Sequence, residues 1–322
     1  MELNIQKIFK ISFLLIDEFS MISFASAIEP LRAANRINGK SLYEWEIFSL
    51  NGQAVSSSNG IYIYPDHSIE DNLKTDILFV CGGLNIKSKV NKTLLGFLRK
   101  LARRGVSLGA LCTASYVLAK AGLLSSKKST IHWENSFSMK EEFPDLEITN
   151  NLFEIDKDRY TSSGGTSSLD LMLNIIIQHQ GSSLAKNVSD QLIHERIRYS
   201  NDYQRMSLRS RLGVSHPKLL TSVSIMEENI EDPISHKELS KKANISLRQL
   251  ERLFKKYLSC TPNQYYIKIR LERSRNLLLQ TSMSILSIAL VTGFTSASHF
   301  SKCYRLFYGI SPRESRNIEL SF

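Results

Sequence analysis

Eight polar side chains near the end of the chain have the residue types and the spacing that recognise bases in DNA. They form two sets about 50 residues apart: Arg248, Gln249, Arg252 and Lys256, and then Ser298, His299, Lys302 and Arg305. Each set lies on the polar side of a segment whose apolar residues recur at helical spacing. A helix fits the major groove, where Arg and Lys pair with guanine and Gln with adenine. One basic helix is more often an ordinary solvated face, but two matching helices favour DNA binding.

Cys112 has a position in the sequence that suggests covalent chemistry. It follows a buried apolar stretch, 106–111, and precedes a helical stretch, 113–121. Such a turn from strand to helix exposes a nucleophile, and the helix N-terminus lowers the pKa of a thiol. His132 is then a candidate base, oriented by one of three carboxylates, Glu134, Asp17 or Glu18. These residues predict a thiol hydrolase, unless Cys112 is a retained pocket residue or an ordinary buried cysteine.

The residues next to the candidate base also have two interpretations. His132, Trp133 and Glu134 are consecutive, and they either contact a ligand or pack in the core at the edge of a strand. The glycine pairs 82–83 and 164–165 allow a close approach of the backbone, although most such pairs are only loops.

The elements that would position these residues alternate in type along the first 190 residues. Apolar, β-branched stretches that predict strands alternate with amphipathic stretches that predict helices. This order predicts a mainly parallel, covered α/β sheet, in which ligands bind at the carboxyl ends of the strands. Neither a dinucleotide-binding glycine motif nor a P-loop motif is present, so nucleotide binding has no support. The expected strands are 10–16, 46–50, 61–64, 76–80, 106–111 and 160–163, and the expected helices are 25–35, 91–103, 113–121 and 168–180.

The last hundred residues have an almost entirely helical pattern and contain an internal near-repeat. Residues 239–246 match 288–295 at an offset of 49, and residues 250–262 match 300–312 at an offset of 50. Each copy predicts a helix-turn-helix unit, at about 237–258 and 286–308, and the helix 262–279 joins the two. Asn244 stands at the turn of the first copy, where asparagine tolerates a positive φ.

Positive charge is concentrated in the same region. Lys and Arg outnumber Asp and Glu by 41 to 31, and residues 217–322 hold 16 and 9 of these, which leaves 25 and 22 for the first 216 residues. A net charge of +7 on the last third, against +3 on the rest, suggests an anionic partner for the last third. The polar stretch 197–218 contains Gly213 and Pro217 and predicts a linker. The expected domains are therefore 1–196 and 219–322.

The cysteines and the apolar runs exclude several classes of protein. Cys81, Cys112, Cys260 and Cys303 lie at least 31 residues apart without a Cys/His cluster, so neither a structural metal nor a disulfide framework is expected. No apolar run approaches the about 18 residues that span a bilayer. The run 11–16 is too short for a signal peptide and is followed at once by two carboxylates. We expect a cytoplasmic protein with no metal, no cofactor and no membrane contact.

Together these features match two known domains. The last part of the chain resembles the AraC/XylS-type DNA-binding domain over roughly 220–320, on the residues Ile288-Ala289, Gly293-Phe294, Ser298, Phe300-Ser301, Tyr304 and 309–313. The first part resembles the PfpI-like domain, similar to class I glutamine amidotransferases, that precedes such a module in GlxA-type transcriptional regulators. That second resemblance rests on 19–21, Ala25, 29–35, 81–83, 108–113, 130–134 and 163–166.

The resemblance implies a sequence-specific DNA-binding transcriptional regulator. It favours an activator that works as a homodimer, with RNA polymerase as a further partner, and it is closest to regulators of arginine, carnitine or glycine betaine metabolism. Active PfpI-like relatives carry a histidine directly after the cysteine, whereas Thr113 stands here, which argues against catalysis.

We therefore expect a regulator controlled by a small metabolite and not an enzyme. The resemblance points to an amino acid derivative or a quaternary ammonium compound, and such a cation requires an aromatic face or a carboxylate when it leaves water. The residues expected to bind it are Glu29, Cys112, His132, Trp133 and Glu134. The alternative function is a cysteine-dependent amidase or a related PfpI-like hydrolase that uses Cys112 and His132.

Overall fold

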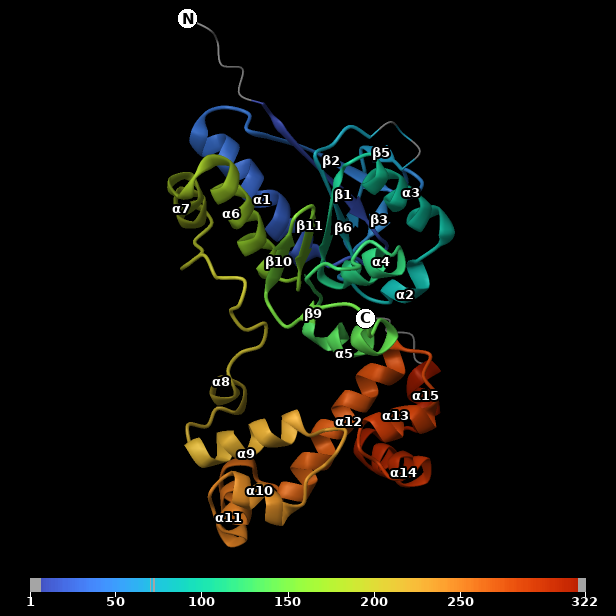
Figure 1. Ribbon diagram of the computed structural model, residues 1–322, viewed down its shortest axis with the longest axis vertical. Helices are drawn as coiled ribbons and strands as arrows, with labels where there is room; N and C mark the ends of the chain where they lie inside the picture. Colours follow the sequence, from blue (N-terminus) through green and yellow to red (C-terminus); the bar gives the residue numbers. More distant parts are fainter. Residues whose placement is uncertain (1–6, 70, 72, 318–322) are drawn as a thin grey trace, which may run out of the picture. The chain divides into compact units, whose positions relative to one another are not determined.

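The computed structural model describes residues 7–69, 71 and 73–317, and the chain divides between Gln204 and Arg205 into two compact units (Figure 1). The first unit is an α/β domain, and the described part of the second unit is helical. The stretch 197–218, predicted as a linker, is shared by the two units. Arg198 forms an ion pair within the first unit, and Arg211 forms one within the second.

A seven-stranded sheet lies at the centre of the first unit, in the order β10-β11-β7-β6-β1-β2-β5. Its neighbouring strands are parallel except for the hairpin of β10 and β11, which leaves β10 antiparallel at the edge. The middle strands are covered on both faces, which explains their continuous apolar sequences. The strands are β1 (Phe9–Leu15), β2 (Tyr43–Ser49), β5 (His67–Ser68), β6 (Ile77–Cys81), β7 (Ser107–Leu111), β10 (Phe153–Asp156) and β11 (Arg159–Ser162).

Helices cover both faces of this sheet (Figure 1). On one face, Phe13 and Phe79 share a core with three helices. On the other face, Leu14 and Val80 share a core with two helices and with Ile86 and Met139 of two further helices. Alternate strand residues point to opposite faces, so β1, β2, β6 and β7 each contribute to both cores. The first face carries α1 (Met21–Asn38), α6 (Ser167–Gln180) and α7 (Ser182–Gln191), and the second carries α3 (Lys92–Arg103) and α4 (Ser115–Lys120). The mainly parallel α/β sheet predicted from the sequence is confirmed.

Short elements complete the first unit. The strand predicted at 61–64 is corrected by the structure. Only two of its residues are extended, and they pair in a separate hairpin instead of joining the main sheet. Tyr62 and Tyr64 are exposed there and Ile63 is only partly buried, so this stretch lacks the buried faces of a strand inside the main sheet. The short elements are β3 (Val55–Ser56), β4 (Tyr62–Ile63), β8 (Ser129–Thr130), β9 (Ile148–Thr149), α2 (Ile86–Lys89) and α5 (Trp133–Glu142).

The second unit contains the two helix-turn-helix copies. α10 (His236–Lys242) and α11 (Leu247–Leu258) form the first, α13 (Ile285–Val291) and α14 (Ala297–Tyr308) form the second, and α12 (Pro262–Gln280) joins them. Asn244 has φ 53° and the matching Gly293 has φ 76°, so both turns use the left-handed conformation that the sequence predicted for Asn244. The remaining helices are α8 (Leu208–Leu212), α9 (Pro217–Glu228) and α15 (Pro312–Asn317).

Candidate functional site

Cys112 lies where the carboxyl ends of four strands meet. It directly follows β7, and its φ of 62° turns the chain sharply into a short 3₁₀ turn and then α4. The segments after β1 and β6 run beside it, because Leu84 N–H donates to Glu18 O at 3.0 Å and Thr113 Oγ1 donates to Gly83 O at 2.7 Å. The sequence therefore predicted the position of the cysteine in the sheet correctly.

The loop after β11 closes the site against Cys112. A Cβ on Gly164 would lie 2.7 Å from Cys112 Cβ and 2.9 Å from its sulfur, so the loop backbone packs directly on this side chain. The next residue, Gly165, donates its N–H to Ser23 Oγ at 2.7 Å. Ser23 in turn acts on the thiol of Cys112, whose pKa it lowers. Three chain segments that are far apart in sequence are thus connected around one thiol.

The thiol of Cys112 is not activated. Burial raises its pKa to about 11, although hydrogen bonds from Thr113 N–H and from Ser23 act in the opposite direction. The negative charge of Glu134 raises the pKa further. The sequence suggested that the N-terminus of the following helix would lower this pKa, but α4 begins only after the 3₁₀ turn and burial dominates.

His132, Trp133 and Glu134 open α5 and do not lie at the edge of a strand. The backbone N–H of His132 donates to Cys112 O at 3.4 Å, which holds the start of the helix beside the thiol. Its Nδ1 accepts from Glu134 N–H at 3.4 Å and caps the helix, and burial lowers the pKa of the imidazole. Trp133 is 38% exposed, and the Glu134 side chain is 45% exposed. These two side chains therefore form an accessible rim near Cys112.

The other acidic candidates have different partners. Asp17 and Glu18 both pair with Lys89 of α2, at 2.9 and 3.3 Å, instead of orienting His132. Glu29 lies six residues along α1 from Ser23 and forms an ion pair with Arg32 at 2.6 Å. The structure brings Cys112, His132, Trp133 and Glu134 together and places Glu29 in a surface pair on the same helix that supplies Ser23.

Ser23 and Lys89 are neighbours of this site that the sequence did not single out, whereas Gly164 belongs to a glycine pair that was predicted to allow a close approach of the backbone. Ser23 lies two residues after the quoted segment 19–21, and Gly164 lies within the quoted segment 163–166. Those matches were the available signals, but neither of them indicates a contact with Cys112. Among the residues that the structure describes, no group of three or more His, Cys, Asp or Glu side chains is arranged to hold a metal ion.

The first predicted recognition helix, α11, presents all four of its candidate side chains to solvent. Leu250, Leu253 and Phe254 are buried on its inner side, and Arg248, Gln249, Arg252 and Lys256 are exposed. Gln249 also has a structural role, because its Oε1 accepts from Ser246 N–H at 2.9 Å in a capping box. The Gln249 amide nitrogen remains free to donate in a base contact.

The second predicted recognition helix, α14, has the same organisation. Phe300 and Tyr304 are buried, and Ser298, His299, Lys302 and Arg305 are exposed. Ser296 Oγ caps the helix by accepting from His299 N–H at 3.2 Å. The His299 ring packs edge-on against Phe294 with 5.8 Å between centroids, which fixes it at the start of the helix.

This combination of fold and site defines a class of protein: an α/β domain with a cysteine at the turn after a central strand, joined to two helix-turn-helix copies with exposed basic helices. Residues 9–178 match the DJ-1/PfpI family, and residues 239–318 match a helix-turn-helix domain family. No helix among the described residues is both long and apolar enough to cross a membrane.

Known transcriptional regulators extend the match over nearly the whole chain. The HTH-type transcriptional regulator GbdR of Pseudomonas aeruginosa is 48% identical, over 95% of this chain and 83% of its own length. The HTH-type transcriptional regulator GlxA of Rhizobium meliloti is 35% identical, over 97% of this chain and 96% of its own length. The crystal structure of an AraC family transcriptional regulator from Pseudomonas putida is 31% identical with a TM-score of 0.53, and covers 57% of this chain and 99% of that one. The chain belongs to the AraC-type transcriptional regulators with an N-terminal DJ-1/PfpI domain, and it is a DNA-binding regulator.

Proposed function

We propose that this regulator is a transcriptional activator controlled by a small cationic metabolite that binds beside Cys112. The observation that carries the proposal is the exposed rim of Trp133 and Glu134, held next to the thiol by the His132 N–H to Cys112 O hydrogen bond. An ammonium group loses strong hydration when it enters a pocket, and an aromatic face with a carboxylate compensates for that loss. The charge of Glu134 already acts on the Cys112 thiol, so a cation placed there would be stabilised.

We further propose that the site binds its ligand without catalysing a reaction. A nucleophilic cysteine requires a thiolate at neutral pH, and the Cys112 pKa of about 11 keeps the thiol protonated. His132 uses Nδ1 to cap α5, and Thr113 stands where active relatives have a histidine. Turnover of any amide substrate that is abolished in Cys112→Ala would contradict this proposal.

The proposed oligomer is a homodimer that contacts RNA polymerase. Each chain has two recognition helices, so a dimer has four and gains avidity on a repeated operator. The proposed location is the cytoplasm, because the named relatives of this chain are bacterial and a protein that acts on a bacterial chromosome works there. Sedimentation of the protein with and without operator DNA tests the dimer, because a 1:1 complex of one chain per operator would exclude it.

The residues proposed to contact DNA bases are Arg248, Gln249, Arg252 and Lys256 of α11 and Ser298, His299, Lys302 and Arg305 of α14. Two units joined by one helix are expected to enter major-groove segments about one turn, roughly 34 Å, apart. Arg252→Ala and Lys302→Ala should each weaken binding to a specific site by about 1–3 kcal/mol and binding to random DNA much less. Equal losses on both DNAs would show that these side chains contact only phosphates.

The effector proposal is tested by calorimetry with arginine, carnitine and glycine betaine. Trp133→Ala and Glu134→Gln should abolish binding of the active compound while the melting temperature without ligand stays unchanged. Glu29→Gln measures whether the ligand reaches the exposed pair of Glu29 with Arg32, since this carboxylate lies further along α1. Binding of an anion or a neutral sugar, with none of the three cations bound, would overturn the cationic effector and leave the DNA-binding role in place.

A further inference from the structure

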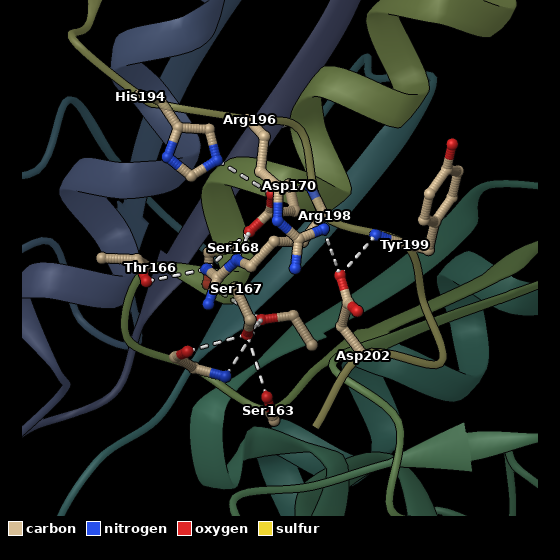
Figure 2. Close-up of polar contacts among 12 residues, drawn as sticks. Ser163, Thr166, Ser167, Ser168, Asp170, His194, Arg196, Arg198, Tyr199 and Asp202 are labelled. Atoms are coloured by element: carbon tan, nitrogen blue, oxygen red, sulfur yellow. Dashed lines mark hydrogen bonds and ion pairs between the residues drawn. The ribbon is translucent and has the colours of Figure 1, made fainter. Parts of the chain in front are cut away.

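The last segment of the first unit, residues 193–204, connects α7 to the DNA-binding unit and is named the exit segment below. It contains no helix or strand, yet several contacts fix it to the first unit, among them the hydrogen bond from Leu152 N–H to Ser200 O at 2.7 Å. Two further points of attachment are at Arg198 and at Gln204. Figure 2 shows the first of these, where Arg198 and His194 converge on the carboxylate of Asp170. Both points of attachment adjoin loops that border Cys112.

The first anchor is a fully buried carboxylate. Asp170 lies in the first turn of α6 with no exposed surface, and it accepts from Arg198 N–H at 2.7 Å and from Arg198 Nε at 2.8 Å. His194 Nε2 lies 2.9 Å from Asp170 Oδ1, the same oxygen that accepts from Arg198 N–H. A buried carboxylate is stable only when it is paired and hydrogen-bonded, and here every one of these partners comes from the exit segment.

Arg198 also contacts the loop that touches Cys112 (Figure 2). Its Nη2 donates to Thr166 Oγ1 at 2.8 Å. Thr166 lies two residues after Gly164, whose backbone packs on the Cys112 side chain, and one residue after Gly165, which donates to Ser23. The loop that packs on Cys112 is therefore joined to the guanidinium of Arg198 by a hydrogen bond.

The second anchor is at the end of the exit segment. Gln204 Nε2 contacts Thr130 Oγ1 at 3.0 Å, Ile131 O at 3.2 Å and Asn151 O at 2.8 Å. Residues 130 and 131 directly precede His132, whose N–H donates to Cys112 O. The second anchor thus lies on the segment that carries Trp133 and Glu134.

We propose that the exit segment responds to occupancy of the Cys112 site and transmits it to the DNA-binding unit, through the Asp170–Arg198–Thr166 contacts and through Gln204. This regulation rests on the proposed effector site. A ligand that contacts the rim or the thiol shifts residues 163–167 or 130–134, and both segments hold the exit segment. The ordered exit segment is one state, and the segment released from its anchors is the other.

A glycine pair allows a test that needs no ligand. In Gly164→Ala the new Cβ would meet Cys112 and displace the loop, whereas in Gly165→Ala it would meet nothing within 4 Å, although both positions have a positive φ. Hydrogen exchange of the full-length protein should then show the amides of 193–204 exchanging about tenfold faster in Gly164→Ala and at nearly the wild-type rate in Gly165→Ala. Unchanged exchange in 193–204, while residues 163–167 do change in Gly164→Ala, would overturn the proposal.

A second pair of variants tests transmission to DNA. Thr166→Val and Arg198→Lys remove contacts between the loop and the exit segment, and Arg196→Lys alters only the exposed pair of Arg196 with Asp202 in the same segment. With arginine, carnitine and glycine betaine as probes, calorimetric binding should persist in all three variants. The change in operator affinity on adding the probe should be lost in Thr166→Val and Arg198→Lys and kept in Arg196→Lys.

The two proposals fail in different ways. If none of the three probes binds the wild-type protein, the cationic effector is wrong, and the exchange experiment on Gly164→Ala still decides the role of the exit segment. If a probe binds and changes operator affinity equally in wild type, Thr166→Val and Arg198→Lys, the effector site stands and the exit segment is not its route to DNA.

Discussion

The thiol of Cys112 has the position of a catalytic nucleophile, but it is not ionised at neutral pH. Cys112 stands at a strained turn after a central strand, but burial keeps its pKa near 11. Alkylation by iodoacetamide, which requires the thiolate, should therefore be slow at pH 7–8 and rise steeply only toward pH 11. Mass spectrometry of the Cys112 peptide over a pH series measures this directly.

The unfolded chain is the control for that experiment. In urea Cys112 loses its burial and should react with the pH profile of an ordinary thiol, near pH 9. Half-maximal alkylation of the folded protein below pH 8 would contradict the structure and revive the hydrolase interpretation.

Residue types were easier to predict than residue partners. Cys112 and its turn followed from a local pattern of apolar strand and helix, which sequence carries directly. The ion pairs could not be predicted in the same way. The pair of Glu29 with Arg32 depends on side-chain conformation, and the pairs of Lys89 with Asp17 and Glu18 join segments about 70 residues apart. Asp170 gave no signal at all in the sequence, since its partners lie on a segment without regular structure.

At the scale of elements, α5 holds the rim in place through its far end. Glu142 accepts from Tyr116 at 2.8 Å and from Lys120 at 3.0 Å, and it also pairs with Lys87. Burial alone would raise the pKa of Glu142, but these three partners outweigh burial and lower it below its ordinary value of 4.5. The carboxylate therefore stabilises the fold above pH 4.5, and this contribution disappears as the pH falls through the lowered value.

Glu142→Gln tests this anchor. The variant should be less stable than the wild type at pH 7, and the difference should shrink as the pH falls below about 4.5, because the wild-type carboxyl is then protonated as well. Urea unfolding of both proteins between pH 3 and pH 7 provides the measurement. A difference that is constant over this range would show that the charge of Glu142 contributes nothing.

The turn of the second helix-turn-helix unit is a further test at this scale. Gly293 has a positive φ, and a Cβ there would lie 2.4 Å from Pro233 Cγ and 2.5 Å from Ile230 O. Gly309, at the end of α14, also has a positive φ but has open space around it. Thermal unfolding should show Gly309→Ala losing about 1–2 kcal/mol, the cost of the left-handed conformation, and Gly293→Ala losing clearly more. Equal losses would mean that the contacts with Pro233 and Ile230 are unimportant.

At the scale of the whole molecule, the chain divides into two compact units between Gln204 and Arg205, inside the polar stretch 197–218 that was predicted as a linker. Arg211 bonds to both carboxylate oxygens of Glu227, which ties α8 to α9 in the second unit. A fragment 205–322 should therefore fold and bind DNA more weakly than the full chain, because the proposed dimer is lost. A fragment 217–322, which lacks α8 and this ion pair, should melt at a lower temperature. Circular dichroism and operator titration compare them, and an unfolded 205–322 fragment would place the boundary elsewhere.

Large-scale organisation was the most predictable part of this protein. The alternation of strands and helices, the repeat at 49–50 residues and the uneven charge distribution are properties of long stretches, so they survive errors at single positions. The end of the first unit was not predictable, since a polar, basic sequence is typical of a free linker. Only the fold brings Arg198 to Asp170 and Gln204 to Thr130.

The close packing of Gly164 on Cys112 has a consequence for how such sensors diversify. A side chain at 164 would collide with the thiol, so mutation at this position gives a damaged loop and not a new specificity. Trp133 and Glu134 are accessible at the start of a helix and can be exchanged without disturbing the sheet. Under the proposed effector site, a gene duplicated from this one would acquire a new effector through codons 133 and 134. In a randomised library selected for folded protein, codon 164 should return to glycine while those two drift freely.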